Sequence, residues 1–179
     1  NVADVMLSVL DGLKVNDELL DAAASLWGLT YNQLAGDSDV RAALEAISEA
    51  RAPAFNAENP DDDRVFYQSW AGVSSVAGIK NPKDKGACDG VIAGGYVKAD
   101  KMHATLVPMA GLTAHGWHLY PNDGMVRVES AKWGTFHGCI PAGHLDEVGY
   151  EREGPDPRTG FDHLAFYRDV AAGLRARGF

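Results

Sequence analysis

The sequence has no long apolar run and few cysteines, and each shortage limits what the chain can be. No stretch approaches the ~20 apolar residues of a membrane-spanning helix. No basic region followed by a hydrophobic one opens the 179 residues, so neither an anchor nor a signal peptide is expected within them. Cys88 and Cys139 are the two cysteines. This number fits one disulfide in a secreted protein, or two reduced and buried thiols in a cytosolic one.

Basic residues are also scarce. The chain has 16 Lys and Arg against 25 Asp and Glu, which gives a net charge of −9, and the two signs are mixed along it. Nucleic-acid binding requires clustered positive charge, so this class of function is excluded. Hydrophobic residues make up 46% and charged residues 23%, which predicts one globular domain with a hydrophobic core.

Apolar periodicity predicts helices toward both ends of the chain and strands between them. The helical patterns cover residues 2–29, 38–52 and 161–177. Short β-rich runs predict buried strands at 65–71 and 134–140. Residues 73–121 are glycine-rich and irregular, and a segment of this length inside a domain is more often functional than idle. Strands and helices in one chain, without internal repeats, predict the α/β class.

Two loop segments carry candidate catalytic residues. Asp123 lies in Asn122-Asp123-Gly124, a turn signal, and His144 follows the second predicted strand. Open α/β sheets assemble sites from loops beyond the carboxyl ends of their strands, so these residues can converge although 21 positions separate them. In such a pair the carboxylate holds the imidazole tautomer, while the imidazole takes a proton from a hydroxyl nucleophile.

The third member of a hydrolytic triad, a serine in a G-x-S-x-G elbow, is not found in the 179 residues. Hydrolases of the α/β type carry their triad in the chain order Ser, then Asp or Glu, then His. A chain that starts downstream of the elbow would therefore show only the last two. The order of Asp123 and His144 predicts the C-terminal part of a cut enzyme, whose partner is an upstream fragment with the serine.

Other interpretations of the same residues remain open at this point. An Asn-Asp-Gly sequence is commonly only a turn, and a lone histidine near a strand end is commonly a satisfied polar group. The chain also has enough histidines and acids for a zinc site. These candidates are His103, His115, His118, His137, His144, Asp146 and Glu147. No H-E-x-x-H or H-x-x-E-H motif accompanies them.

Three separated motifs resemble the C-terminal catalytic region of the secreted bacterial true lipases of the Pseudomonas and Burkholderia type. Residues 122–126, Asn-Asp-Gly-Met-Val, are similar to the family's N-D-G-L-V turn with the triad aspartate. Residues 144–147, His-Leu-Asp-Glu, resemble the N-H-L-D-E segment with the triad histidine, and residues 67–72 resemble its Y-S-W-A-G strand. The motifs keep the family's order over residues 65–148, and weaker similarity extends into the C-terminal helix. The resemblance implies triad roles for Asp123 and His144.

The resemblance also implies an architecture. The chain would be the C-terminal part of a single α/β-hydrolase domain, a parallel sheet flanked by helices. Residues 1–50 would form the helical lid, and residues 51–179 would supply the last strands, the Asp and His loops and the C-terminal helix. Because the family is secreted, a Cys88–Cys139 disulfide is favoured, although the family places its own bridge elsewhere.

The family holds a structural calcium ion through two aspartates. One lies two positions after the histidine and corresponds to Asp146. The other lies a little over twenty residues before the triad aspartate, where Asp100 is the nearest candidate although its register is off by about one. Calcium at Asp100 and Asp146 would fix the backbone that presents His144.

The function implied by the resemblance is a secreted carboxylic ester hydrolase, specifically a triacylglycerol lipase that works on lipid or ester at an interface. The alternatives are a polyester depolymerase such as a polyhydroxyalkanoate depolymerase, a short-chain esterase, or a non-catalytic scaffold subunit. Two departures from the family bear on substrate preference. Gly143 replaces the family's asparagine, and residues 151–160 are a charged stretch with prolines that resembles an insertion.

Overall fold

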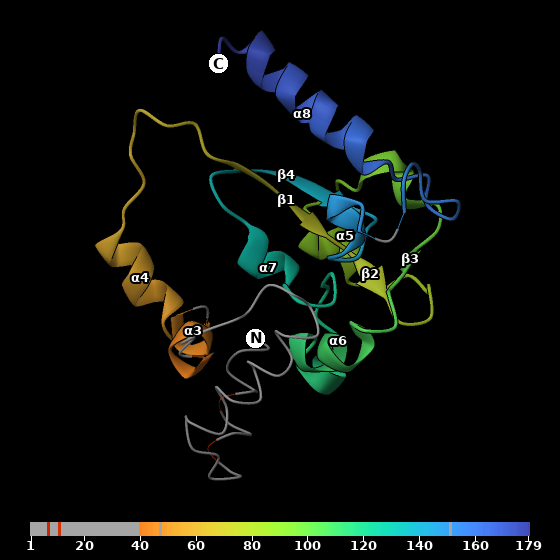
Figure 1. The fold of residues 1–179 in the computed structure, drawn as a ribbon, viewed down its shortest axis with the longest axis horizontal. Coiled ribbons are helices and arrows are strands. Elements are labelled where there is room, and N and C mark those ends of the chain that lie inside the picture. Colours follow the sequence, from red (N-terminus) through yellow and green to blue (C-terminus); the bar gives the residue numbers. More distant parts are fainter. Residues whose placement is uncertain (1–6, 8–10, 12–39, 47, 151) are drawn as a thin grey trace. The chain divides into compact units, whose positions relative to one another are not determined.

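The computed structural model of the chain describes residues 7, 11, 40–46, 48–150 and 152–179. These residues belong to two compact units, Asn1–Arg64 and Val65–Phe179. Helices expected over residues 2–29, and most of the expected lid over residues 1–50, lie outside the described residues. Figure 1 shows the order of the elements along the chain.

Two short helices lie in the described part of the first unit. They are α3 (Val40–Ala46) and α4 (Ala52–Glu58). The expected single helix over 38–52 is therefore wrong at its C-terminal end, because α3 ends at Ala46 and a new helix begins at Ala52. Pro53 lies in the first turn of α4, where a proline has no intrahelical partner to lose and its fixed φ suits the helix.

The second unit contains two small parallel sheets. β1 (Gln68–Gly72) pairs with β4 (Thr135–Ile140), and β2 (Ser74–Ser75) pairs with β3 (Asp100–Lys101). Both strands expected from sequence are confirmed, with their starts moved by one to three residues. Parallel partners need a crossover connection, and the helices between residues 84 and 131 lie in those connections, which agrees with the general α/β class.

Short helices fill the segment that the sequence predicts to be irregular. They are α5 (Asp84–Ala87), η1 (Ala93–Tyr96), α6 (Val107–Thr113) and η2 (Gly116–His118). Beyond it lie α7 (Val128–Ala131), η3 (Asp146–Val148) and α8 (His163–Ala176). Helix α8 confirms the expected C-terminal helix, and the Asp162 side chain caps it by accepting from the backbone N–H of Leu164 and of Ala165.

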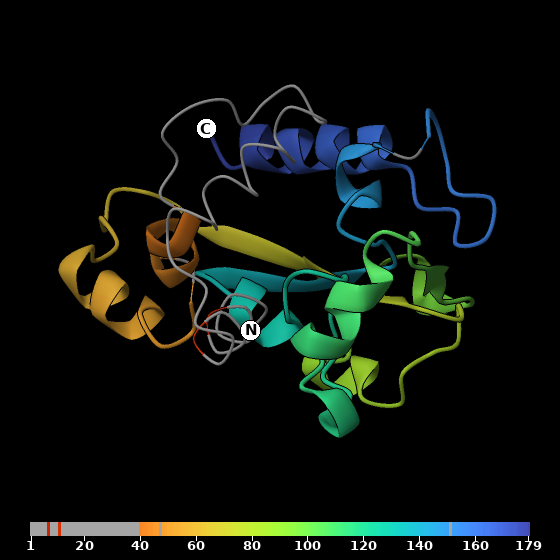
Figure 2. The ribbon, with the colours of Figure 1, turned by 60° about the horizontal axis from the view of Figure 1, so that its bottom comes forward.

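The second unit is layered. Figure 2 shows α8 along one face of the β1–β4 pair, with α6 and α7 on the opposite side. On the α8 face, the Trp70 ring of β1 stacks on His137 of β4 and meets the ring of Phe166 edge to face at 5.5 Å. Within the residues that the structure describes, no helix is both long and apolar enough to span a bilayer.

A disulfide joins α5 to β4 at the centre of the unit. Cys88 and Cys139 are bonded, and both are buried in a cluster with Ala71, Val73 and Val128. The two-thiol alternative is therefore excluded in this structure. The bond closes a loop of 51 positions around the segment that contains β3, α6 and α7, so it ties much of the irregular region to the sheet.

Candidate active site

The Asn122-Asp123-Gly124 turn holds the Asp123 carboxylate rigidly. One carboxylate oxygen, Oδ1, accepts from the backbone N–H of Met125 at 2.8 Å and of Val126 at 2.6 Å. Gly124 has a φ of +106°, a conformation that side chains rarely adopt. The turn thus leaves the second oxygen of a buried carboxylate available to another loop.

His144 meets that second oxygen. It lies on the loop after β4, and its backbone N–H donates to the Asp123 carbonyl at 2.9 Å. Its ring Nδ1 lies 2.8 Å from Asp123 Oδ2. Since a carboxylate only accepts, Nδ1 carries the proton, and Nε2 of the neutral ring is left as an acceptor. The structure therefore brings together the two residues predicted to be catalytic.

The pKa of His144 reflects this pairing. The hydrogen bond to Asp123 raises it above the usual value of a histidine, burial of the ring opposes the rise, and the negative charge of Asp123 adds to it. An imidazole whose protonated form is stabilised in this way can take a proton and keep it until a leaving group needs it.

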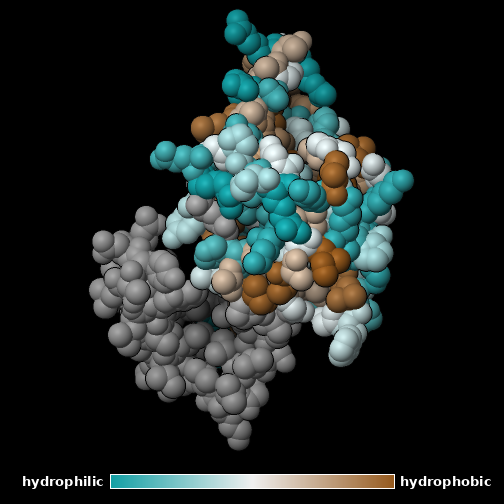
Figure 3. Space-filling model, turned by 90° about the vertical axis from the view of Figure 1, so that its right-hand side faces the viewer, coloured by the Kyte–Doolittle hydropathy of each residue, from teal (hydrophilic) through white to brown (hydrophobic). Residues whose placement is uncertain are grey.

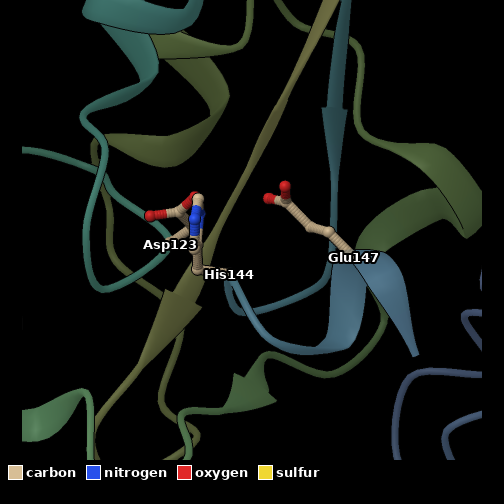
Figure 4. Close-up of side chains that lie close together, drawn as sticks. All are labelled: Asp123, His144 and Glu147. Carbon is tan, nitrogen blue, oxygen red and sulfur yellow. The ribbon is translucent and has the colours of Figure 1, made fainter. Parts of the chain in front are cut away.

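Glu147 completes the cluster, and the sequence pointed to it only as part of the zinc alternative. Figure 4 shows its carboxyl group beside Asp123 and His144. Its Oε1 is buried without a hydrogen-bond partner and lies over Gly72, where any larger residue would collide with it. Burial raises the pKa of Glu147 to about 8, with the charge of Asp123 as the second cause.

Asp123, His144 and Glu147 each offer a ligand atom, and these atoms lie within 4.8 Å of one another. Within the described residues, this is the group of three metal-ligating side chains that the fold assembles. The other histidines of the zinc alternative do not join it. They are His103, His115, His118 and His137. A zinc site of the composition considered from sequence is thus not formed.

The two predicted calcium ligands converge at Gly143, directly before His144. Asp100 and Asp146 are both buried. A Cβ placed on Gly143 would lie 3.3 Å from Asp100 Oδ2 and 3.5 Å from Asp146 Oδ2. Burial raises the pKa of Asp100 to about 6, and the charges of Asp146 and Asp156 contribute to the rise. A cation between the two carboxylates would relieve this crowding of negative charge.

The sheet places these groups. β1 and β4 run parallel; the His144 loop follows the carboxyl end of β4 at Ile140, and the Asp123 turn, between η2 and α7, lies against the carboxyl end of β1 at Gly72. The Ser74 backbone N–H donates to the Asn122 carbonyl at 3.0 Å, which ties the Asp123 turn to the chain leaving β1. This is the end at which open α/β sheets build their sites.

Comparisons with known proteins found no match for this chain. No protein-family model, no curated protein and no solved structure matches the chain. The function has to be inferred from the chemistry of the site.

Proposed function

We propose that this chain supplies the base and the orienting acid of a serine ester hydrolase with the α/β-hydrolase fold. The observation that carries the proposal is the 2.8 Å contact between His144 Nδ1 and a buried Asp123 oxygen whose partner oxygen is held by two backbone amides. His144 lies on the loop beyond the carboxyl end of β4, the Asp123 turn is bonded to the chain leaving β1, and their order along the chain is that of the fold's triads.

In the proposed reaction, a serine hydroxyl adds to the ester carbonyl carbon while His144 Nε2 takes its proton. The C–O bond to the alcohol then breaks, and His144 returns the proton to the departing oxygen. A water molecule, deprotonated by His144, adds to the acyl carbon; the bond to the serine oxygen then breaks, His144 returns the proton to that oxygen, and the carboxylic acid is released. Asp123 stabilises the imidazolium in both halves and keeps the ring in the productive tautomer.

We propose that the serine lies on a polypeptide segment upstream of these 179 residues. No G-x-S-x-G is present in them. The sheet also favours an additional segment: among the described residues β1 and β4 pair only with each other as full strands, whereas parallel sheets ordinarily contain more strands. Further parallel strands would extend this sheet and bring the nucleophile to its carboxyl end.

A triacylglycerol substrate is proposed on the three motifs that resemble the true lipases, with residues 1–50 as the lid. The Cys88–Cys139 disulfide supports a secreted protein, because such bonds persist in oxidising compartments. Polyester depolymerase and short-chain esterase remain the alternatives within the same chemistry. A scaffold subunit would keep the Asp123–His144 pair without a nucleophile.

Labelling with an alkyl phosphonate ester tests the chemistry. We expect the 179-residue chain by itself to hydrolyse p-nitrophenyl esters no faster than buffer and to remain unlabelled. Together with the upstream segment, it should hydrolyse them and carry one phosphonate, which mass spectrometry should place on a serine outside these residues. Enzymatic rates from the 179 residues alone, or a label within them, would refute the proposed division of the site.

We propose that calcium binds between Asp100 and Asp146. Both carboxylates are buried and lie within 3.5 Å of one point beside Gly143, so an oxygen-preferring cation fits the donors present. When bound, the ion would be structural: it would tie the loop of His144 to the segment that contains β3. Asp146 would act by positioning the backbone two residues from the base.

Removing calcium should therefore lower stability before it lowers activity. Chelation by EGTA is expected to lower the melting temperature by several degrees, because an ion that binds only the folded state stabilises it by mass action. Asp146→Asn should reproduce this loss and make the protein insensitive to EGTA, whereas the exposed Asp169→Asn should leave the response intact. Binding should weaken below about pH 6, where a proton competes for Asp100. An unchanged melting temperature with no divalent ion in elemental analysis would contradict the site.

A further inference from the structure

The charged stretch that departs from the lipase motifs forms a loop with internal bonds of its own. We name its described part, residues 152–161, the clamp loop. The buried Asp156 carboxylate organises it: Oδ1 accepts from the backbone N–H of Arg158 at 2.8 Å and of Thr159 at 2.6 Å. The Asp156 backbone N–H donates to the Phe161 carbonyl at 2.7 Å, which closes the loop. These bonds fix the backbone from which the Arg158 side chain projects.

The Arg158 guanidinium binds two backbone carbonyls beside the β2–β3 pair. Its Nε donates to the Ala99 carbonyl at 2.7 Å, and its Nη2 donates to the Gly78 carbonyl at 2.6 Å. Ala99 directly precedes β3. Gly78 lies in the turn after β2, where its own N–H donates to the Ser75 carbonyl at 3.1 Å. The planar fork of guanidinium donors suits two acceptors at once, so one side chain links the turn after β2 to the residue before β3.

Gly78 is adapted to this contact. Its φ of +65° is one that other residues rarely adopt. A Cβ placed on it would lie 2.5 Å from Arg158 Nη2 and 2.7 Å from Arg158 Cζ, so the guanidinium would have to move away. The contact between the clamp loop and the chain after β2 therefore depends on two separate positions, and it can be removed from either one.

The β2–β3 pair is too short to be stable by itself. Each strand has two residues, and Ser74 is paired with Asp100 and Ser75 with Lys101. Within the part of the chain that the structure describes, the pair belongs to no larger sheet. Figure 3 shows the second unit from the side on which β3 lies in Figure 1, and hydrophilic side chains cover much of this surface. Isolated two-stranded pairs are at best marginally stable in water, so the bonds from Arg158 add a restraint that these strands need.

The restraint acts on Asp100, one of the two proposed calcium ligands. The Ala99 carbonyl and the Asp100 N–H belong to one planar peptide group, so a bond to this carbonyl fixes the plane from which Asp100 projects. The Ser74 hydroxyl donates to Asp100 Oδ2 at 2.5 Å and holds the carboxylate from β2. Groups that orient a ligand without touching the metal typically change metal affinity by roughly 10- to 100-fold.

We infer that Arg158 is a positioning residue for the cation site at Asp100 and Asp146, and that the clamp loop holds β2 and β3 in place for it. The inference rests on the calcium site proposed above. It assigns a role to a segment that has no counterpart in the lipase motifs. Simple electrostatics predicts the opposite effect, because a guanidinium near a cation site repels the cation and its removal should strengthen binding. The direction of the change therefore separates positioning from charge.

Calcium titration by isothermal calorimetry of the full chain, well below its melting temperature, tests the inference. Arg158→Gln should raise the dissociation constant for calcium roughly tenfold or more. Arg158→Lys should raise it by a similar factor, because an ammonium keeps the charge but cannot span both carbonyls. Gly78→Ala should weaken binding as well, since its methyl group displaces the guanidinium. Arg168→Gln is the matched control: it removes an exposed positive charge on α8 and should leave the dissociation constant unchanged.

Hydrogen exchange in EGTA gives a second readout that does not require the ion. The Met102 backbone N–H, which donates to the Ser75 carbonyl beside the β2–β3 pair, should exchange faster in Arg158→Gln. The Cys139 N–H of β4 should exchange as in the unaltered protein. A dissociation constant that is unchanged or lower in Arg158→Gln would overturn the inference and leave the calcium site standing. Absence of calcium binding by the unaltered protein would instead refute the calcium site, and this role of Arg158 with it.

Discussion

Replacing His144 with alanine is expected to lower kcat/KM for ester hydrolysis by roughly 10⁶-fold, and removing the carboxylate of Asp123 by roughly 10⁴-fold, as in other hydrolytic triads. The measurement requires the assembled enzyme with its nucleophile. For the acid, Asp123→Asn is preferable to alanine. The asparagine carbonyl oxygen can still accept from Met125 and Val126, so the turn is kept while the charge and the imidazole tautomer are lost.

Two further variants distinguish the loss of catalytic activity at the Asp123–His144 pair from a general loss of folding. The double variant Asp123→Asn/His144→Ala should be scarcely worse than His144→Ala alone, because the members of a triad act as one unit. His103→Ala should retain nearly full activity, since the His103 ring contacts Thr105 and has no part in the cluster. Near-normal turnover of Asp123→Asn, with unchanged folding, would remove Asp123 from the proposed mechanism.

Breaking the Cys88–Cys139 bond should have the largest effect on stability. The bond closes a loop of 51 positions, and the lost constraint on the unfolded chain corresponds to about 4 kcal/mol. Cys139→Ser is therefore expected to lower the melting temperature by roughly 10 °C, and the midpoint of urea unfolding should fall with it. The sulfur positions are also buried in the core of the second unit, so serine adds an unpaired hydroxyl there.

The double variant Cys88→Ala/Cys139→Ala separates the loss of the cross-link from the cost of burying an unpaired hydroxyl. It removes the cross-link without adding a hydroxyl, so it should be less unstable than a serine variant and should match the unaltered protein after reduction with dithiothreitol. Dithiothreitol should have no effect on the double variant. Identical melting temperatures of oxidised and reduced protein would show that the bond contributes nothing to the free energy of unfolding.

Local sequence was sufficient for features that depend on neighbouring residues. Asn122-Asp123-Gly124 forms a turn because asparagine and aspartate side chains bond to nearby amides and glycine accepts the left-handed backbone, and the structure shows both. Period and composition likewise predicted α8 and both strands of the β1–β4 pair. The turn, the strand and the triad order made Asp123 and His144 candidates, and the resemblance to the lipase motifs led to their choice before any contact was known.

Contacts between distant segments could not be predicted in this way. The sequence offered Asp100 with a register error, and packing places it beside Asp146 at Gly143. It offered two cysteines in either redox state, and the fold joins α5 to β4 through them. It did not assign Glu147 to the Asp123–His144 cluster, because its carboxyl is buried over Gly72, a residue 75 positions earlier, and burial is a property of the assembled fold.

The middle of the chain also differs in what neighbouring residues and what distant contacts determine. Residues 73–121 carry weak local preferences, so their pattern predicts little beyond irregularity. The disulfide, the parallel pairing of β2 with β3, and side-chain contacts such as Lys83 with the His118 carbonyl organise them into short elements. Turns and amphipathic helices arise from interactions over a few residues. The buried pair of Asp100 and Asp146 arises because contacts between distant segments compensate for the burial of charge.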